Sequence, residues 1–390
     1  MNGFENAGAM LRDMQSLIPD RVRAPRADLA KPRVSVILPV RNGMPYLPMA
    51  VESILSQTFG DFELIIVDDA STDSTPECLA ELTDPRVRVI RNERNLGVSK
   101  SLNKALALAR GEYIARQDAD DLSFPKRLAK QVAFLDSHPE VGLLGSDLDI
   151  IDQNGVVVVP SSGVPHADID IKWQLLFKCP MPHSSIMVRP QVLAQFGCYP
   201  EAAEFRYAED YELWSRVTEV IKAANLPDVL IQWRANMASV SSRHDEPQRE
   251  QMRTMSLNNI RRTMGVDVCQ QAFDDANALF RSARGRYLQL PPARLRAALS
   301  FLEALQESFY AKYRFSRAEV AAHRRRCHWI WGKHLLMLSL RGRAGLGPRL
   351  TLLLLGIRYL LHLTRFFDLG VSRSQPQGDA ASVLETAELR

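Results

Sequence analysis

The stretch GEYIARQDADDL, from Gly111 to Leu122, ends a β-type run in three carboxylates, Asp118, Asp120 and Asp121. Neighbouring carboxylates repel one another, so the cluster gains nothing for the fold unless a positive charge lies among them. A divalent cation is the simplest candidate, because Mg²⁺ and Mn²⁺ are held by one or two carboxylates together with waters and substrate phosphates. The alternative is a solvated loop that caps the helix opening near Phe124.

Strand and helix patterns alternate before this stretch. Short apolar, β-branched runs predict buried strands, and residues at helical spacing lie between them. The predicted strands cover residues 34–40, 62–69, 87–90 and 112–116, and the predicted helices cover residues 47–58, 71–82 and 99–110. This order predicts an α/β fold with a mostly parallel, doubly wound sheet.

Acidic residues follow two of these strands. Asp68 and Asp69 end the second strand, and Asp118 and Asp120 follow the fourth. Ligands bind beyond the carboxyl ends of the strands in such sheets, so we expect a site there. The sequence has no Gly-x-Gly-x-x-Gly after the first strand and no Gly-Lys-Ser/Thr loop, which argues against a dinucleotide-binding fold and a P-loop.

Composition indicates a folded globular protein of two or three structural units. The chain has 390 residues, of which 46% are hydrophobic and 24% charged. Its five cysteines are scattered and show no zinc-binding spacing or disulfide framework, so a reduced, cytosolic setting is expected. Residues 1–30 contain no apolar run, which predicts a flexible arm over residues 1–32 and no secretory signal peptide.

Charge is distributed unevenly along the chain. The net charge is +4, yet residues 320–367 contain nine Arg and Lys and no Asp or Glu, so the remainder is net acidic. A basic, acid-free and apolar segment predicts an anionic partner.

The chain resembles the family 2 glycosyltransferases, which have the GT-A fold, from Arg33 to Ser242. Five motifs in the family's order carry the resemblance: VSVILPVRN (34–42), VDDASTDST (67–75), RNLGVSKSLNKAL (94–106), QDADD (117–121) and AEDYELWSR (208–216). The resemblance implies an inverting, metal-dependent transferase. Its donor would be a nucleoside diphosphate sugar, with UDP favoured, and its acceptor a glycan or a lipid-linked glycan in cell-surface polysaccharide or glycolipid assembly.

Processive members of this family carry a Gln-x-x-Arg-Trp motif and several long apolar spans. Here only Gln-Trp-Arg occurs, at residues 232–234, and the several spans are missing. We therefore expect the transfer of one sugar per encounter.

The resemblance assigns donor binding to residues near the strand ends. Asp69 resembles the aspartate that hydrogen-bonds the nucleotide base, and Arg41 has a charge suited to a diphosphate. The whole implied donor-binding set is Pro39, Val40, Arg41, Asn42, Asp69, Asn95, Gly97, Asp118 and Arg234. Asn95 and Gly97 have a structural alternative, because they also suit a plain turn before a helix.

The resemblance places the metal at the carboxylate stretch. Asp120 is expected to contact the metal directly, and Asp118 to reach the ribose or the metal, while Asp121 supports the next loop. Mn²⁺ or Mg²⁺ would bridge both phosphates and neutralise the charge that grows on the leaving group.

The acceptor side is expected in the second half of the domain. Asp210 matches the family's general base, with Glu209 beside it, although the helix dipole also favours carboxylates at a helix N-terminus. His183, at the start of a predicted strand over residues 183–188, resembles an acceptor-side position, with a structural role as the alternative. Trp233 would stack on a sugar and Arg234 would face the phosphates. Asn154-Gly155 predicts a hairpin between residues 141–152 and 156–160.

The resemblance ends near residue 244, and helical patterns follow the catalytic domain of residues 33–244. Residues 245–322 predict a helical extension that packs on that domain or on a second copy of the chain, as a homodimer. Residues 323–370 predict basic amphipathic helices that associate with an anionic membrane, and residues 371–390 a disordered tail. The enzyme would then be cytoplasmic and peripheral on the inner face of the cell membrane, with no nucleic-acid partner.

The apolar stretch from Leu350 to Leu369 allows three structures. It is long enough to span a bilayer. However, Arg358, His362 and Arg365 recur on one helix face, which favours a helix lying in the membrane interface. A helix packed against residues 339–346 is the third alternative.

Two other functions fit parts of the sequence. A metal-dependent phosphohydrolase also uses Asp-x-Asp, but that pair usually follows the first strand and is followed by Thr or Val. A non-catalytic nucleotide-sugar binding module is the other function, and the candidates for both a metal ligand and a base count against it.

Overall fold

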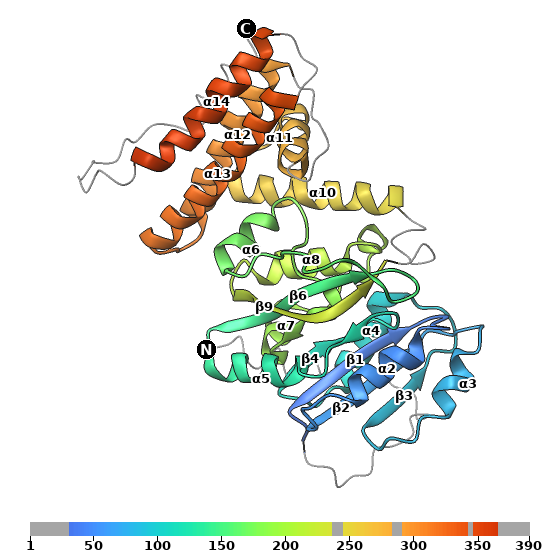
Figure 1. The fold of residues 1–390 in the computed structure, drawn as a ribbon. Helices are drawn as coiled ribbons and strands as arrows, with labels where there is room; N and C mark the ends of the chain where they lie inside the picture. The colour runs from blue at the N-terminus through green and yellow to red at the C-terminus, as the bar shows by residue number, and fades with distance from the viewer. Residues whose placement is uncertain (1–30, 236–244, 283–290, 342–345, 366–390) are drawn as a thin grey trace. The chain divides into compact units, whose positions relative to one another are not determined.

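The computed structural model describes residues 31–235, 245–282, 291–341 and 346–365 (Figure 1). The chain divides into two compact units, Met1–Met255 and Ser256–Arg390. The predicted tail of residues 371–390 and nearly all of the predicted arm lie outside the described ranges.

The first half of the sheet is parallel, as predicted. Its strands, in spatial order, are β3 (Val87–Arg91), β2 (Phe62–Asp68), β1 (Val34–Val40) and β4 (Tyr113–Arg116). Every residue of β1 and β2 is buried, as expected of parallel strands whose two faces are both covered. The register places Val40 beside Asp68 and Ile37 beside Arg116, so the strand ends that lead into the acidic residues are neighbours.

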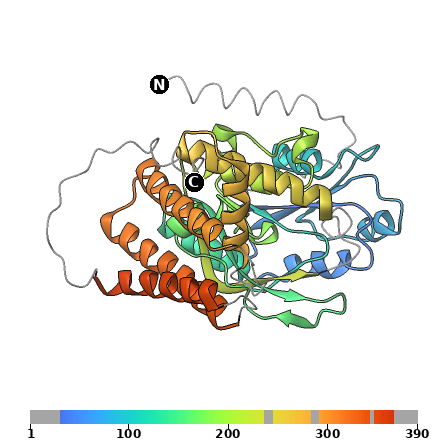
Figure 2. The same cartoon turned by 90° about the horizontal axis from the view of Figure 1, so that it is seen from above.

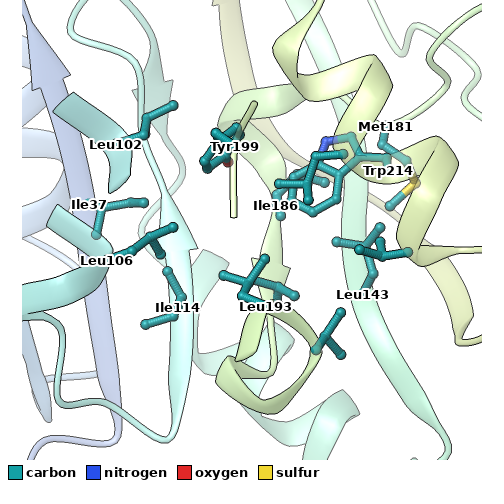
Figure 3. Close-up of a cluster of buried hydrophobic side chains, with 14 of the residues drawn as sticks. Ile37, Leu102, Leu106, Ile114, Leu143, Met181, Ile186, Leu193, Tyr199 and Trp214 are labelled. Atoms are coloured by element: carbon teal, nitrogen blue, oxygen red, sulfur yellow. The ribbon is translucent and has the colours of Figure 1, made fainter. Parts of the chain in front are cut away.

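Alternate residues of these strands enter two hydrophobic cores, one on each face of the sheet. Ile37 and Ile65 belong to one core, and Val36 and Leu64 to the other. The crossover helices are α2 (Leu47–Leu55), α3 (Thr75–Ala80) and α4 (Val98–Leu108). Figure 3 shows part of the first core, to which α4 contributes Leu102.

The second half of the sheet is mixed. It consists of β5 (Leu122–Ser123), β6 (Val141–Ile151), β7 (Val157–Val159), β8 (Met187–Val188) and β9 (Lys222–Arg234). The described residues form a nine-stranded sheet of order β3-β2-β1-β4-β8-β6-β9-β5, with β7 paired to β6 as the predicted hairpin. The longest ladder, β6 with β9, is parallel, whereas β8 is antiparallel to both of its neighbours.

Short helices connect these strands. They are α5 (Arg127–Ser137), α6 (Asp168–Gln174), η1 (His183–Ser185), α7 (Pro190–Phe196), η2 (Ala203–Phe205) and α8 (Glu209–Val217). The prediction that a strand begins at His183 is wrong, because residues 183–185 form a 3-10 turn. Both the amide and the hydroxyl of Ser185 donate to the carbonyl of Pro182, at 2.9 and 2.8 Å, and the strand begins only at Met187.

Helices make up the described part of the second unit. They are the end of α10 (Asp245–Met264), α11 (Gln270–Ser282), α12 (Pro292–Lys312), α13 (Arg317–Arg341) and α14 (Leu346–Arg365). α13 and α14 lie side by side in both views (Figures 1 and 2), and each of α11 and α14 packs against α12.

The α14 helix packs on the helices before it. A Cβ placed on Gly356 would lie 3.1 Å from the Gly332 carbonyl oxygen, so the backbones of α13 and α14 nearly touch. The Tyr359 hydroxyl donates to Glu303 of α12 at 2.7 Å, and the Arg349 guanidinium donates to the Ser339 carbonyl at 2.8 Å. Residues 350–365 of this stretch therefore pack on α13 and α12, residues 366–369 lie outside the described ranges, and contact of this helix with a membrane interface stays a prediction. Within the described ranges no helix combines the length and apolarity needed to cross a membrane.

Candidate active site

The loops after β1 and β2 are joined by hydrogen bonds. The amides of Asn42 and Gly43 donate to the Ser71 and Thr75 hydroxyls, both at 2.8 Å, and Asn42 Oδ1 accepts from the Thr72 amide at 2.8 Å. Asn42 has a φ of 53°, a left-handed conformation that Asn tolerates better than most residues. The predicted donor-binding loop therefore has a fixed shape. Within it, Pro39 and Val40 belong to β1 and Arg41 is exposed.

Asp69 holds the turn that contains two other predicted donor residues. Its carboxylate accepts hydrogen bonds from the amides of Leu96 and Gly97 and from the Asn92 side chain, each at 2.8 Å. Gly97 has a φ of 90°, which favours glycine, and Asn95 Oδ1 accepts from the Gly97 amide at 3.1 Å. The structure thus brings Asp69, Asn95 and Gly97 together. A base contact by Asp69 stays a prediction.

Asp118 is paired with Arg116 at the end of β4. The Arg116 side chain is buried and forms an ion pair with Asp118. The hydroxyl of Ser184 lies 2.8 Å from the Asp118 carboxylate and also contacts Asp121. The Arg116 guanidinium donates to this hydroxyl at 3.1 Å. Burial alone would raise the pKa of Asp118, but the neighbouring Arg116 holds it below the ordinary value. Asp118 is therefore ionised and already neutralised by the protein.

Asp120 has a different environment from its neighbour. Its side chain is half-buried, and burial together with the charge of Asp118 raises its pKa to about 6. Among the described residues no other residue donates a hydrogen bond to its carboxylate, so its oxygens can bind a ligand. Within the described ranges no three His, Cys, Asp or Glu side chains are arranged to hold a metal. The carboxylates of the loop fit Mg²⁺ or Mn²⁺, since these ions use one or two carboxylates and complete their coordination shell with phosphates and waters.

Arg234 fastens three segments to the carboxylate loop. Its amide donates to the Asp121 carboxylate at 2.8 Å, so Asp121 supports the loop, as predicted. Its buried guanidinium donates to the Asp120 carbonyl at 2.9 Å and the Asp152 carbonyl at 3.0 Å, and it stacks 4.5 Å from the ring of Tyr46. The contacts described for this guanidinium are structural, and its predicted phosphate contact is untested. The preceding residue, Trp233, is partly exposed on β9.

Glu209 and Asp210 open α8, as predicted. The Tyr211 amide donates to Asp210 at 2.7 Å, and the buried Leu213 and Trp214 fix the helix in the core. Burial and the charge of Asp210 raise the pKa of Glu209 to about 8, and burial raises the pKa of Asp210. Glu209 therefore keeps its proton at neutral pH, and Asp210 is the better candidate for the ionised base.

The short turn η1 connects the two acidic groups. Ser184 contacts Asp118 and Asp121, whereas the ring of its neighbour His183 lies 6.3 Å from that of Trp214 on α8. For Asp120, Glu209 and Asp210 alike, burial is the largest cause of the raised pKa. The charges of Arg116 and Asp118 also act on all three carboxyls, in opposite directions. The charges of Arg116 and Asp118 thus act on both the carboxylate loop and the α8 N-terminus, and that the two groups form one site stays a prediction.

His183 is neutral in this site. Burial and the nearby Arg116 lower its pKa well below the ordinary value, and its Nε2 lies 2.8 Å from the Tyr199 hydroxyl. These contacts orient the ring, and its acceptor-side role stays a prediction.

Three residues of the site were not predicted: Arg116, Ser184 and Tyr199. Only Arg116 could have been found from the sequence, because it is a basic residue at the end of the predicted strand of residues 112–116, two positions before Asp118. Ser184 and Tyr199 come from distant segments with no motif of their own.

Comparison with known proteins agrees with this geometry. The Glycosyl transferase family 2 model matches residues 35–190. The chain is 39% identical over 211 residues to the putative glycosyltransferase EpsE of Bacillus subtilis (strain 168), covering 52% of this chain and 73% of EpsE. It is 28% identical over 212 residues to the UDP-Glc:alpha-D-GlcNAc-diphosphoundecaprenol beta-1,3-glucosyltransferase WfgD of Escherichia coli, covering 54% of this chain and 79% of WfgD.

Among solved structures, S. aureus TarS 1-349 in complex with UDP-GlcNAc is 19% identical, with a TM-score of 0.49, over 85% of this chain and 92% of that one. The predicted fold class, an α/β GT-A fold with C-terminal helices, is confirmed. The family match and the relative EpsE lead to the same conclusion: the chain is a glycosyltransferase and belongs to glycosyl transferase family 2.

Proposed function

We propose that this enzyme is an inverting, metal-dependent transferase that moves one sugar from a nucleoside diphosphate donor, with UDP favoured, to a lipid-linked or other glycan acceptor. The observation that carries the proposal is η1, which contacts the carboxylate loop through Ser184 and α8 through His183. The name of the E. coli relative describes a UDP-glucose donor and a lipid diphosphate-linked acceptor, which supports the choice of substrates. Cell-surface polysaccharide or glycolipid assembly is the proposed setting.

In the proposed reaction Asp210 takes the proton of the acceptor hydroxyl. The acceptor oxygen forms a bond to the anomeric carbon as that carbon's bond to the diphosphate breaks, and the nucleoside diphosphate leaves on the opposite side. A single displacement inverts the anomeric centre. A divalent cation held by Asp120 would neutralise charge on the departing diphosphate. Burial raises the pKa of Asp210, which strengthens it as a base, while the charge of Arg116 opposes part of that rise.

Asp210→Asn tests the base. The amide keeps the shape of the carboxylate but cannot take a proton, so we expect kcat to fall by about 10²- to 10⁴-fold while donor binding is retained. Glu212→Gln is the matched control, because it removes a carboxylate of the same helix that is paired with Arg216. Near-normal transfer by Asp210→Asn would remove this residue from the mechanism, and product with retained anomeric configuration would overturn the single displacement.

Asp120→Asn tests the cation site. We expect Mn²⁺-dependent donor binding, followed by titration calorimetry, to weaken, since the change removes a carboxylate oxygen that would bind the cation. Asp228→Asn is the control, because Asp228 is a partly exposed carboxylate paired with Lys130. Unchanged metal dependence in Asp120→Asn would argue against the site.

The proposal includes a location. We propose that the enzyme works peripherally at the cytoplasmic face of an anionic membrane, where a lipid-linked acceptor would be presented. Its support is the basic segment of residues 320–367, which lacks Asp and Glu. Homodimer formation stays a prediction.

A further inference from the structure

The α13–α14 pair exposes large apolar side chains at helical spacing. On α13 they recur along one stripe, and on α14 along another. The residues of this outer face are Trp329, Ile330, Met337 and Leu340 on α13 and Leu350, Leu354 and Ile357 on α14. Leu340 is 67% exposed and Leu354 is 59% exposed, so these side chains are not part of the core of the unit.

Both stripes lie on the same side of the helix pair. The helices are antiparallel and cross where Gly332 meets Gly356, which fixes their facing sides. On α14 the buried Tyr359 contacts Glu303 of α12, so this side of the pair is the covered one. On a helix wheel centred on the glycine contact, both exposed stripes fall on the side opposite α12. The result is one continuous outer face across two helices.

The charges of the outer face have one sign. Lys333 is exposed within the α13 stripe and Arg326 is exposed at its start, whereas Arg358 of α14 is paired with Glu303 of α12 and belongs to the other side. Residues 320–365 contain no Asp or Glu. An anionic partner would therefore meet positive charge and apolar surface together. A symmetric dimer through this face would instead bring the Lys333 side chains of both copies near one another.

We propose that the outer face docks flat on an anionic lipid surface. The leucines would enter the boundary between headgroups and acyl chains, while Lys333 and Arg326 meet lipid phosphates. This mode needs no opening of the α13–α14 pair and no helix that crosses the bilayer. That docking brings the active site to a lipid-linked acceptor rests on the proposed function. Docking on the lipid surface does not depend on that function.

Vesicle binding by the full chain tests the proposal. Wild-type protein should sediment with vesicles of phosphatidylcholine and phosphatidylglycerol, but weakly with phosphatidylcholine alone. The double variant Leu350→Asn/Leu354→Asn should lose about tenfold in affinity for each leucine, because two apolar side chains no longer enter the lipid. Lys333→Gln should lose about fivefold, and this difference should disappear as salt is raised.

The control variant changes apolar side chains in the other unit of the chain. Val156→Asn/Val158→Asn removes two exposed apolar side chains from the β6–β7 hairpin of the first unit and should bind like wild type. Circular dichroism confirms that each variant is folded. Docking through this face is overturned if the leucine variant is folded and binds anionic vesicles normally. It is also overturned if wild-type protein does not bind anionic vesicles and forms a dimer that the leucine variant does not form.

Transfer to a soluble acceptor analogue is measured on the same proteins. Failure of transfer with normal vesicle binding counts against the proposed function, not against docking.

Discussion

Replacing Arg234 by Met should loosen the hairpin between β6 and β7 and weaken the cation site together. The guanidinium donates to the carbonyls of Asp120 and Asp152, at 2.9 and 3.0 Å, and to that of Gln153 at 3.3 Å. It also stacks on Tyr46 at 4.5 Å. Met has a similar length and keeps the apolar contacts of the side chain, so the change isolates the charged head.

The size of the effect follows from these contacts. Each of the two shorter hydrogen bonds contributes about 1 kcal/mol after water replaces the lost donor, because the carbonyls are not fully buried. The cation–π contact adds about 1 kcal/mol. Only the bonds to the Asp152 and Gln153 carbonyls join Arg234 to the hairpin, so the opening free energy of the hairpin should fall by about 1 to 2 kcal/mol, or roughly tenfold in its opening equilibrium. The bond to Asp120 and the contact with Tyr46 stabilise the carboxylate loop instead. Arg234 also lowers the pKa of Asp120, so its loss should raise that pKa above about 6 and reduce Mn²⁺ affinity near neutral pH.

Hydrogen exchange and Mn²⁺ titration measure the two effects on the same protein. Exchange is followed at the Gly155 amide, which donates to the Asp152 carbonyl at 3.1 Å in the hairpin turn. The matched control is Arg216→Met. Arg216 donates to the Cys198 carbonyl at 3.0 Å and to Glu212, at the far end of α8 from Asp210. This variant should destabilise its own surroundings and leave the hairpin and Mn²⁺ affinity unchanged.

Either of two results would refute the reasoning. If Arg234→Met is folded and the hairpin exchanges as in wild type, then Arg234 does not fasten it. If the hairpin loosens but Mn²⁺ affinity is unchanged, the link from Arg234 to Asp120 is wrong.

Three further predictions follow from the electrostatics and hydrogen bonds. Mn²⁺ affinity should fall about tenfold per pH unit below about pH 6 in calorimetric titrations, because protons then compete for Asp120; a flat profile would contradict this. Glu209→Gln should raise the melting temperature above about pH 8 and have little effect near pH 4. The folded state holds the Glu209 proton up to about pH 8 and the unfolded state only to its ordinary pKa, so the carboxyl costs stability as pH rises between these values. Asp69→Asn should weaken donor binding about tenfold, since an amide donor would face the amides of Leu96 and Gly97; unchanged affinity would separate Asp69 from the donor.

The sequence was sufficient for the parallel half of the sheet. VSVILPV predicts a strand over residues 34–40 and the structure has it there, because a strand buried on both faces must be apolar at every position. The sequence also predicted that α8 begins at Glu209, because acidic residues precede the apolar Leu213 and Trp214 at helical spacing.

Contacts between distant segments could not be predicted. Periodicity places the carboxylates at a sheet edge but does not reveal that Arg116 neutralises Asp118, or that Ser184 joins Asp118 to Asp121. The strand predicted from His183 failed for a local reason, since the bonds to the Pro182 carbonyl favour a turn over extension. Packing of α14 also depended on a contact that no pattern encodes, the approach of two glycines on separate helices.

The position of β9 in the chain has a consequence for synthesis. Arg234, whose amide binds the Asp121 carboxylate, lies 113 residues after it. A nascent chain leaving the ribosome therefore forms its four parallel strands well before the carboxylate loop acquires its anchor. Until β9 emerges, β6 also presents an unpaired edge to other nascent chains. The anchoring of the carboxylate loop and the pairing of the β6 edge are thus gained at the same step of translation.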